Sequence, residues 1–181
     1  TSTIAMTMED GQCRGCVQKV SAVMHCNTDR LSTPVRWECT EEMFRGDTPV
    51  PGTKIAKSAA VRDGTLTVAG AAASRTQKIG DAYTVNWALF DAVGRLPRET
   101  FEPVRFVLLD HFDQYKPNQA VHYRNSVKVA LKTGPVMLHL YDHFGCGNLP
   151  WTYFVNDGGI MVLAVAGLEA YGLAGITGGS A

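Results

Sequence analysis

The carboxyl-terminal part of this sequence lacks positive charge. Residues 133–181 contain no lysine or arginine, and after Asp142 the only formally charged residues are Asp157 and Glu169. A segment with so few groups that favour solvent is expected to be buried, within its own domain or against another chain. The apolar run Ile160–Leu173 is shorter than the roughly 17–25 residues of a transmembrane helix. We therefore expect no membrane span.

The sequence also lacks an excess of charge of either sign. Lysine plus arginine and aspartate plus glutamate both number 17 among 181 residues. A balanced chain has no long-range field to attract nucleic acid without sequence preference. Two groups of neighbouring aromatic and basic residues, Tyr115-Lys116 and His122-Tyr123-Arg124, leave weak nucleic-acid contact as a possible local interaction.

No window shows the 10–12 residues of apolar spacing that a long helix requires. One helical turn is expected at most, over Pro97–Pro103. Period-two alternation predicts strands instead, and Asp63-Gly64 and Lys132–Pro135 have the composition of hairpin turns. The alternating segments lie around Leu66 and Val68, over Tyr83–Leu89, over Val127–Leu131 and over Gly159–Gly172. This pattern predicts an all-β protein, an antiparallel sandwich, with a jelly roll as first choice and a calycin-like β-barrel as second.

The length suits one β domain over residues 1–181. Its beginning, about residues 1–52, is expected to be an irregular segment that carries most of the cysteines. The valines between Asp10 and Val23 repeat every three residues, which fits a weak helix and a strand equally well. Thr48–Gly52 contains two prolines and is expected to be a turn or an extended arm.

Five cysteines, an odd number, leave three alternatives for their chemistry. Cys13 and Cys16 have the spacing of half a zinc site, and His25, Cys26 or Cys39 would have to complete it. The second half of a zinc-finger spacing is missing, so a disulfide and plain thiols are favoured over zinc.

Two further patterns suggest chemistry without a complete motif. Gly11–Cys16 is similar to the nucleophile segment of papain-like cysteine proteases, but no tryptophan follows and no histidine lies after His143. His139, His143 and Cys146 could supply three metal ligands, or one histidine could act as a general base. On a strand, however, His139 and His143 lie about 13 Å apart, which is too far for one metal ion.

The order of these segments resembles the single jelly-roll coat (capsid) proteins of small non-enveloped viruses. The resemblance covers roughly Leu66 to Ala181 and rests on Tyr83–Asp91, Val93–Phe101, Tyr123–Ala130 and the charge-poor segment Gly159–Ala181. It implies a structural, self-assembling protein of the virion, whose partners are copies of itself or related coat subunits.

The alternative is a small β-barrel that binds or transforms an apolar ligand. Its cavity would be lined by Trp87, Tyr141, Trp151 and Phe154. A secreted recognition domain is a further alternative, with a secreted location if the coat hypothesis is wrong. The sequence favours a protein that is not an enzyme, and we assign no catalytic, cofactor-binding or metal-binding residue and no cofactor.

Overall fold

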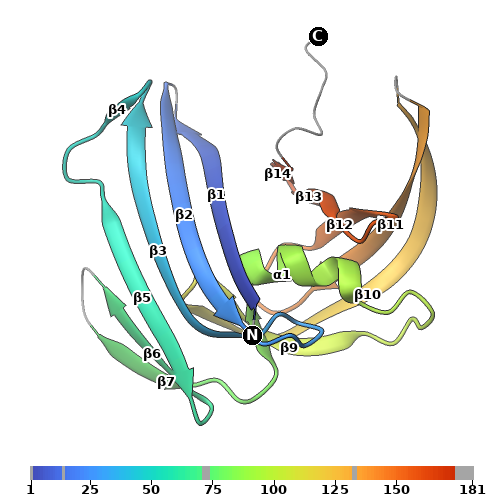
Figure 1. Cartoon of the computed structure of the whole chain (residues 1–181), viewed down its shortest axis with the longest axis horizontal. Helices are drawn as coiled ribbons and strands as arrows, with labels where there is room; N and C mark the ends of the chain where they lie inside the picture. Colours follow the sequence, from blue (N-terminus) through green and yellow to red (C-terminus); the bar gives the residue numbers. More distant parts are fainter. Residues whose placement is uncertain (1, 14, 71–73, 132–133, 174–181) are drawn as a thin grey trace. The chain divides into compact units, whose positions relative to one another are not determined.

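The computed structural model describes residues 2–13, 15–70, 74–131 and 134–173, and their side chains except those of residues 10–13. These residues form mostly antiparallel β-structure, which confirms the all-β prediction. The chain divides into two compact units, Thr1–Asp81 and Ala82–Ala181, and each unit is built on one sheet (Figure 1). That the whole chain is one domain stays a prediction.

The first unit is a meander of strands in the order β1-β2-β3-β5-β6-β7, with β4 paired to β3. Where an irregular segment over residues 1–52 was expected, the structure has four strands. Along most of β2 every second residue is buried, as in a strand. The spacing of its valines, every three residues, did not predict this. The strands are β1 (Ser2–Cys13), β2 (Cys16–Cys26), β3 (Pro34–Arg45), β4 (Thr48–Pro49), β5 (Ile55–Arg62), β6 (Thr65–Gly70) and β7 (Arg75–Lys78).

Burial alternates along the strands of this sheet. On β3, Trp37 is buried while Arg36 and Glu38 are exposed, and on β6 Leu66 and Val68 are buried on either side of an exposed residue. Residues directly opposite each other on antiparallel strands share a face, so each row continues across the sheet. One face is therefore apolar and buried, and the other carries small and polar side chains.

The predicted turn at Asp63-Gly64 is confirmed. It joins β5 to β6, and both residues have positive φ, +48° and +65°. Two successive positive φ values are the mark of a type I′ turn, whose twist matches that of the flanking strands.

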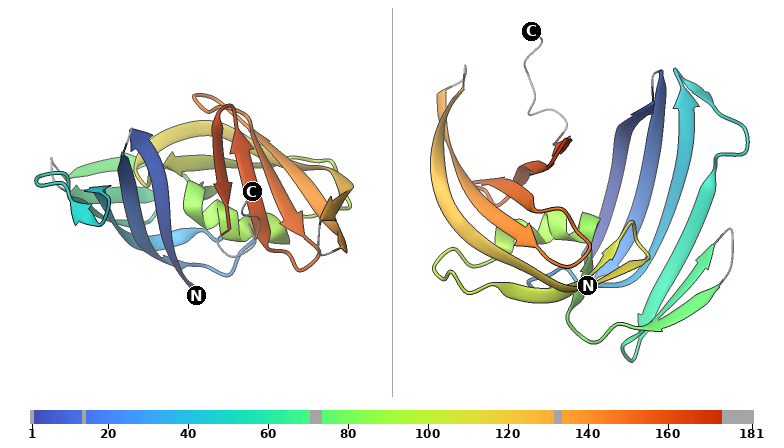
Figure 2. Two further views of the ribbon diagram at one scale, coloured as in Figure 1. Left: turned by 90° about the horizontal axis from the view of Figure 1, so that it is seen from above. Right: turned by 180° about the vertical axis from the view of Figure 1, so that it is seen from behind.

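The second unit is a meander in the order β14-β13-β12-β11-β10-β9-β8, antiparallel except for the parallel pair β8 and β9. The long strands β10 and β11 bend strongly (Figure 2), and β10 contains two register shifts. The turn predicted at Lys132–Pro135 falls partly on residues 132 and 133, which lie outside the described residues, as do residues 174–181. The strands are β8 (Tyr83–Val85), β9 (Val104–Asp110), β10 (Gln114–Leu131), β11 (Gly134–Phe144), β12 (Trp151–Asn156), β13 (Met161–Ala166) and β14 (Glu169–Gly172).

The strand expected over Tyr83–Leu89 is wrong in its second half. Only β8 is extended, and Asn86–Ala92 forms the helix α1, followed by a 3-10 turn, η1, over Val93–Arg95. The buried residues of the helix are Trp87, Ala88, Leu89 and Ala92. Val85 offers no side-chain cap, so the usual start signal is missing. The helical turn expected over Pro97–Pro103 does not form.

The connections of both sheets join neighbours in the chain. In a jelly roll, Greek-key connections would instead pair strands that are distant in sequence. Within the confirmed all-β class, the pairing is therefore that of two meanders, apart from the parallel pair β8 and β9.

Candidate functional site

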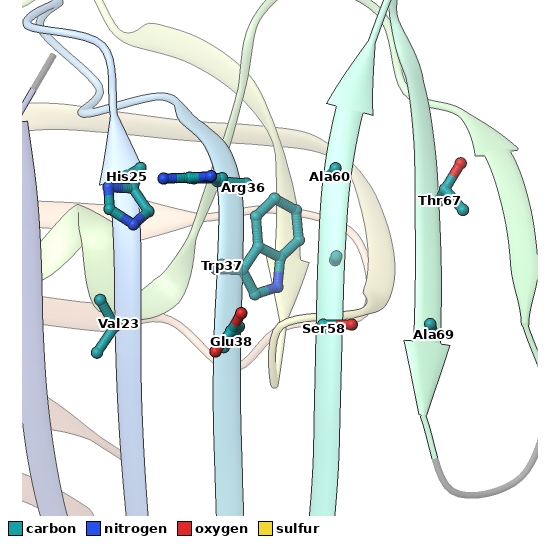
Figure 3. A pocket seen from close by; sticks show the side chains of 10 residues that line it. Val23, His25, Arg36, Trp37, Glu38, Ser58, Ala60, Thr67 and Ala69 are labelled. Atoms are coloured by element: carbon teal, nitrogen blue, oxygen red, sulfur yellow. The ribbon is translucent and has the colours of Figure 1, made fainter.

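The exposed face of the first sheet is hollowed by a groove of about 450 Å³ (Figure 3). Strands β2, β3, β5 and β6 contribute to it. The residues that line it on β2 and β3 are Val23, His25, Arg36, Trp37 and Glu38, and those on the other two strands are smaller. We call this hollow the β2–β6 groove.

The groove exists because four small side chains follow one another where larger ones would fill the space. Ser58 and Ala60 on β5 lie directly opposite Ala69 and Thr67 on β6. On the other side, the same two residues of β5 lie opposite the larger Glu38 and Arg36 of β3. The small side chains of β5 and β6 therefore form the floor of the groove, and the longer charged side chains of β3 form a wall along it.

The wall carries two unpaired charges. Within the part of the chain that the structure describes, neither Arg36 nor Glu38 makes an ion pair or a side-chain hydrogen bond. Arg36 extends from β3 toward His25, its partner on β2 (Figure 3), and His25 Nδ1 lies 3.3 Å from Thr3 Oγ1. Arg36 and Glu38 are two residues apart on one face, a separation of about 6.6 Å. The groove thus offers a cation and an anion to a bound molecule.

A chain of polar side chains crosses the second sheet. Tyr123 Oη lies 2.7 Å from Ser126 Oγ, Ser126 Oγ lies 2.8 Å from His139 Nδ1, and His139 Nε2 lies 2.9 Å from Asp157 Oδ1. We call these four residues the Ser126 chain. Ser126 and His139 are directly opposite on β10 and β11, and Asp157 follows the end of β12.

A bulge in β10 assembles the Ser126 chain. Tyr123 and Ser126 are three residues apart, so a regular strand would direct them to opposite faces. The register shifts between Tyr123 and Asn125, which leaves Arg124 as the extra residue. Tyr123 consequently pairs with Tyr141 and Ser126 with His139, two residues of β11 that share a face. Bulges often re-aim a side chain beside an active site.

The second histidine of β11, His143, is buried in a different network. Its Nδ1 lies 3.0 Å from Tyr153 Oη, and its Nε2 lies 3.1 Å from Gln119 Oε1. The Gln119 amide donates to the carbonyls of Pro117 and Cys146, which fixes its orientation. Burial lowers the pKa of His143 from 6.5 to about 4, partly opposed by Asp110, with a smaller lowering by Lys116. The ring is therefore neutral at neutral pH, and this network is part of the core.

The candidate metal ligands His139, His143 and Cys146 do not converge. The two histidines have the separate partners given above, and Cys146 is exposed. Among the described residues, no group of three histidine, cysteine, aspartate or glutamate side chains could hold a metal ion. The two histidines are four residues apart on one strand, a separation of about 13 Å, and this distance keeps them from binding one metal ion.

The amino-terminal cysteines are placed on β-strands. Cys16 is buried and begins the strand β2 instead of a helix, so the papain-like arrangement does not form. Cys39 lies opposite Ala22, four residues along β2 from Cys26, or about 13 Å. His25 and Cys26 are adjacent and face opposite sides. The side chain of Cys13 lies outside the described residues.

The predicted apolar cavity does not form from its four aromatic residues. Tyr141 and Trp151 share a face of the second sheet, because Tyr141 lies opposite Tyr153 and Trp151 is two residues from it. Phe154 is on the other face, since it is an odd number of residues from Trp151. Trp87 is buried on α1, with its ring 5.2 Å from Phe112.

The basic residues of the two predicted nucleic-acid pairs have acidic partners. Lys116 Nζ lies 2.5 Å from Asp110 Oδ2, and Arg124 Nη1 lies 3.2 Å from Asp142 Oδ1. Self-association and nucleic-acid contact stay predictions. In the described ranges, no helix is long and apolar enough to cross a membrane.

Comparison with known proteins supports the fold and not the viral resemblance. No protein-family model and no curated protein matches the sequence. A solved structure, a β-barrel-like protein of domain of unknown function DUF1849 from Brucella abortus, is similar in fold. The TM-score is 0.55 at 10% identity, over 93% of this chain and 76% of that one.

The viral interpretation is wrong, because the structural neighbour is a bacterial protein. The coat-protein, capsid and virion assignments and the virion location fall with it. That interpretation rested on strand order and charge-poor strands, which antiparallel β-proteins of unrelated function share.

Proposed function

We propose that the protein binds a small amphipathic molecule in the β2–β6 groove. The observation that carries this proposal is a hollow with a floor of small side chains beside a charged wall whose Arg36 and Glu38 have no partners in the described chain. Its volume of about 450 Å³ falls in the range of small-molecule sites, roughly 300–1,000 Å³. A β-barrel-like structural neighbour is compatible with ligand binding.

The groove determines the chemistry of the ligand. Val23, Ala60 and Ala69 present apolar surface, so a flat apolar body can lie on the floor. The Arg36 guanidinium, beside His25, can donate two parallel hydrogen bonds to a carboxylate or sulfonate. Glu38 can accept a hydrogen bond from a donor on the same molecule. The expected ligand class is a planar amphipathic anion.

Anilinonaphthalene sulfonate, a flat aromatic anion that fluoresces in apolar surroundings, is a suitable probe. Titration of the probe into the full chain should give a saturable rise in fluorescence. The substitution Arg36→Met should raise the Kd by about tenfold or more, because it removes one charge-assisted hydrogen bond to the sulfonate. Arg45→Met is the matched control, because Arg45 lies at the far end of the same strand. The control should bind like the parent chain.

A second substitution tests the floor independently of charge. Ala60→Leu would fill the groove while leaving Arg36 in place, and the position is only half-buried on the outer face, so folding should be preserved. Binding should fall as it does in Arg36→Met. Equal affinity of the parent chain, Arg36→Met and Ala60→Leu, with circular dichroism unchanged, would exclude the groove as the ligand site.

A further inference from the structure

The hydrogen atoms of the Ser126 chain have one arrangement that is consistent with a neutral imidazole. A carboxylate can only accept, so His139 Nε2–H donates to Asp157. His139 Nδ1 then carries the lone pair and accepts from the Ser126 hydroxyl. Ser126 Oγ in turn accepts from the Tyr123 hydroxyl. A serine that donates to an imidazole held by a carboxylate is the arrangement that activates a nucleophile.

The surroundings of Ser126 allow a substrate to reach it. Ser126 is exposed, whereas the His139 side chain is 12% exposed and so is held by its neighbours. The Tyr123 ring stacks on Phe101, with centroids 6.5 Å apart, and Phe101 is 72% exposed. An apolar ring this exposed, stacked on the tyrosine that contacts Ser126, offers a surface on which an acyl group can lie.

We propose that Ser126 is the nucleophile of an esterase site for substrates with a small apolar acyl group. This activity lies beyond ligand binding in the β2–β6 groove and uses other residues. His139 is the general base, Tyr123 stabilises the oxyanion, and Asp157 is a positioning residue that acts through His139.

The reaction balances without a cofactor. Ser126 Oγ forms a bond to the ester carbonyl carbon while its proton moves to His139 Nδ1, and the Tyr123 hydroxyl turns its hydrogen bond to the oxyanion. The tetrahedral intermediate collapses, the bond to the leaving alcohol breaks, and the alcohol takes the proton from His139. Water then attacks the acyl-serine by the same proton transfer and releases the carboxylic acid.

A fluorophosphonate probe tests the nucleophile directly. Ser126 Oγ displaces fluoride from phosphorus, so mass spectrometry of the parent chain should find the adduct on the peptide that contains Ser126. His139→Gln keeps a donor and an acceptor but cannot take the proton, and it should slow labelling about 100-fold. Ser126→Ala should abolish labelling. Ser21→Ala, at an exposed serine of β2, should leave it unchanged.

Hydrolysis of p-nitrophenyl acetate separates the roles of the other residues. Asp157→Asn should lower kcat several-fold and leave KM unchanged, because Asp157 does not touch the substrate. Tyr123→Phe should also lower kcat. An unlabelled parent chain, labelling that persists in Ser126→Ala, or His139→Gln that reacts at the parental rate would each overturn the proposal. Anilinonaphthalene sulfonate binding should be unaffected in all these variants, so failure here is distinguishable from failure of the groove.

Discussion

The two sheets differ in whether their polar side chains have hydrogen-bond partners. On the outer face of the first sheet, Arg36 and Glu38 stand beside a hollow without partners in the described chain. In the second sheet, both nitrogens of His139 and of His143 lie within hydrogen-bond distance of a neighbour. Unpaired groups at a hollow remain available to a ligand, whereas paired groups are held in a fixed geometry by their partners.

The two histidines of β11 repeat this contrast at closer range. His143 accepts from Tyr153 and donates to Gln119, all buried, so its hydrogen bonds hold the core. Burial raises the pKa of Tyr153, which keeps its hydroxyl as the donor. His139 has the same proton arrangement, but its hydroxyl partner is an exposed serine. The same hydrogen-bond pattern is therefore structural in one place and chemically accessible in the other.

The largest effect on stability is expected from a substitution at Gly94, where the backbone of η1 closely approaches the backbone of Gly159 in the second unit. A Cβ at Gly94 would lie 1.7 Å from the Gly159 carbonyl oxygen. Because neither backbone can yield easily, Gly94→Ala should lower the free energy of unfolding by about 3–5 kcal/mol. Urea denaturation measures this.

Gly147→Ala is the control for that substitution. Gly147 has φ +68° and open space around the position of a Cβ. Only the left-handed backbone should cost free energy there, about 1 kcal/mol. If both variants were equally stable, the close packing of η1 on the β12–β13 turn would not be rigid.

A smaller effect is expected from pH. The pKa of His143 is 6.5 ordinarily and about 4 when the chain is folded, so between these values the unfolded chain binds more protons. The corresponding stability is complete above about pH 6.5 and is lost as pH falls toward 4, a loss on the order of 3 kcal/mol. Urea denaturation of the parent chain at successive pH values measures the slope.

His143→Gln removes the titrating group and should flatten this pH dependence. The variant will be less stable than the parent chain at neutral pH, because the Gln119–Tyr153 network is disturbed, but the slope is the quantity compared. A slope equal to that of the parent chain would assign the acid sensitivity to other residues.

Local signals predicted much of the fold and little of the sites. The turn at Asp63-Gly64 could be predicted, because a type I′ turn needs residues that tolerate positive φ. The helix α1 was not, because Tyr83–Leu89 alternates like a strand and Val85 provides no cap. A seven-residue helix is decided by packing, with Phe90 against Tyr153 and Tyr171, and not by its own pattern.

The sites depend on contacts between strands that sequence spacing does not reveal. Tyr123 and Ser126 share a face only because of the bulge at Arg124, and no residue there is a sequence signal for a bulge. The groove could have been suspected from the small residues at alternate positions, Ser58 and Ala60, then Thr67 and Ala69. Their alignment with Arg36 required the register of three strands.

The claim that the β2–β6 groove of the first sheet binds the amphipathic anion is tested most directly by amide NMR during titration with anilinonaphthalene sulfonate. The largest shift changes should fall on β2, β3, β5 and β6, at Val23, Arg36, Ala60 and Ala69, while the amides of the second unit stay in place. Shift changes concentrated on the second unit, with the groove residues unaffected, would contradict it.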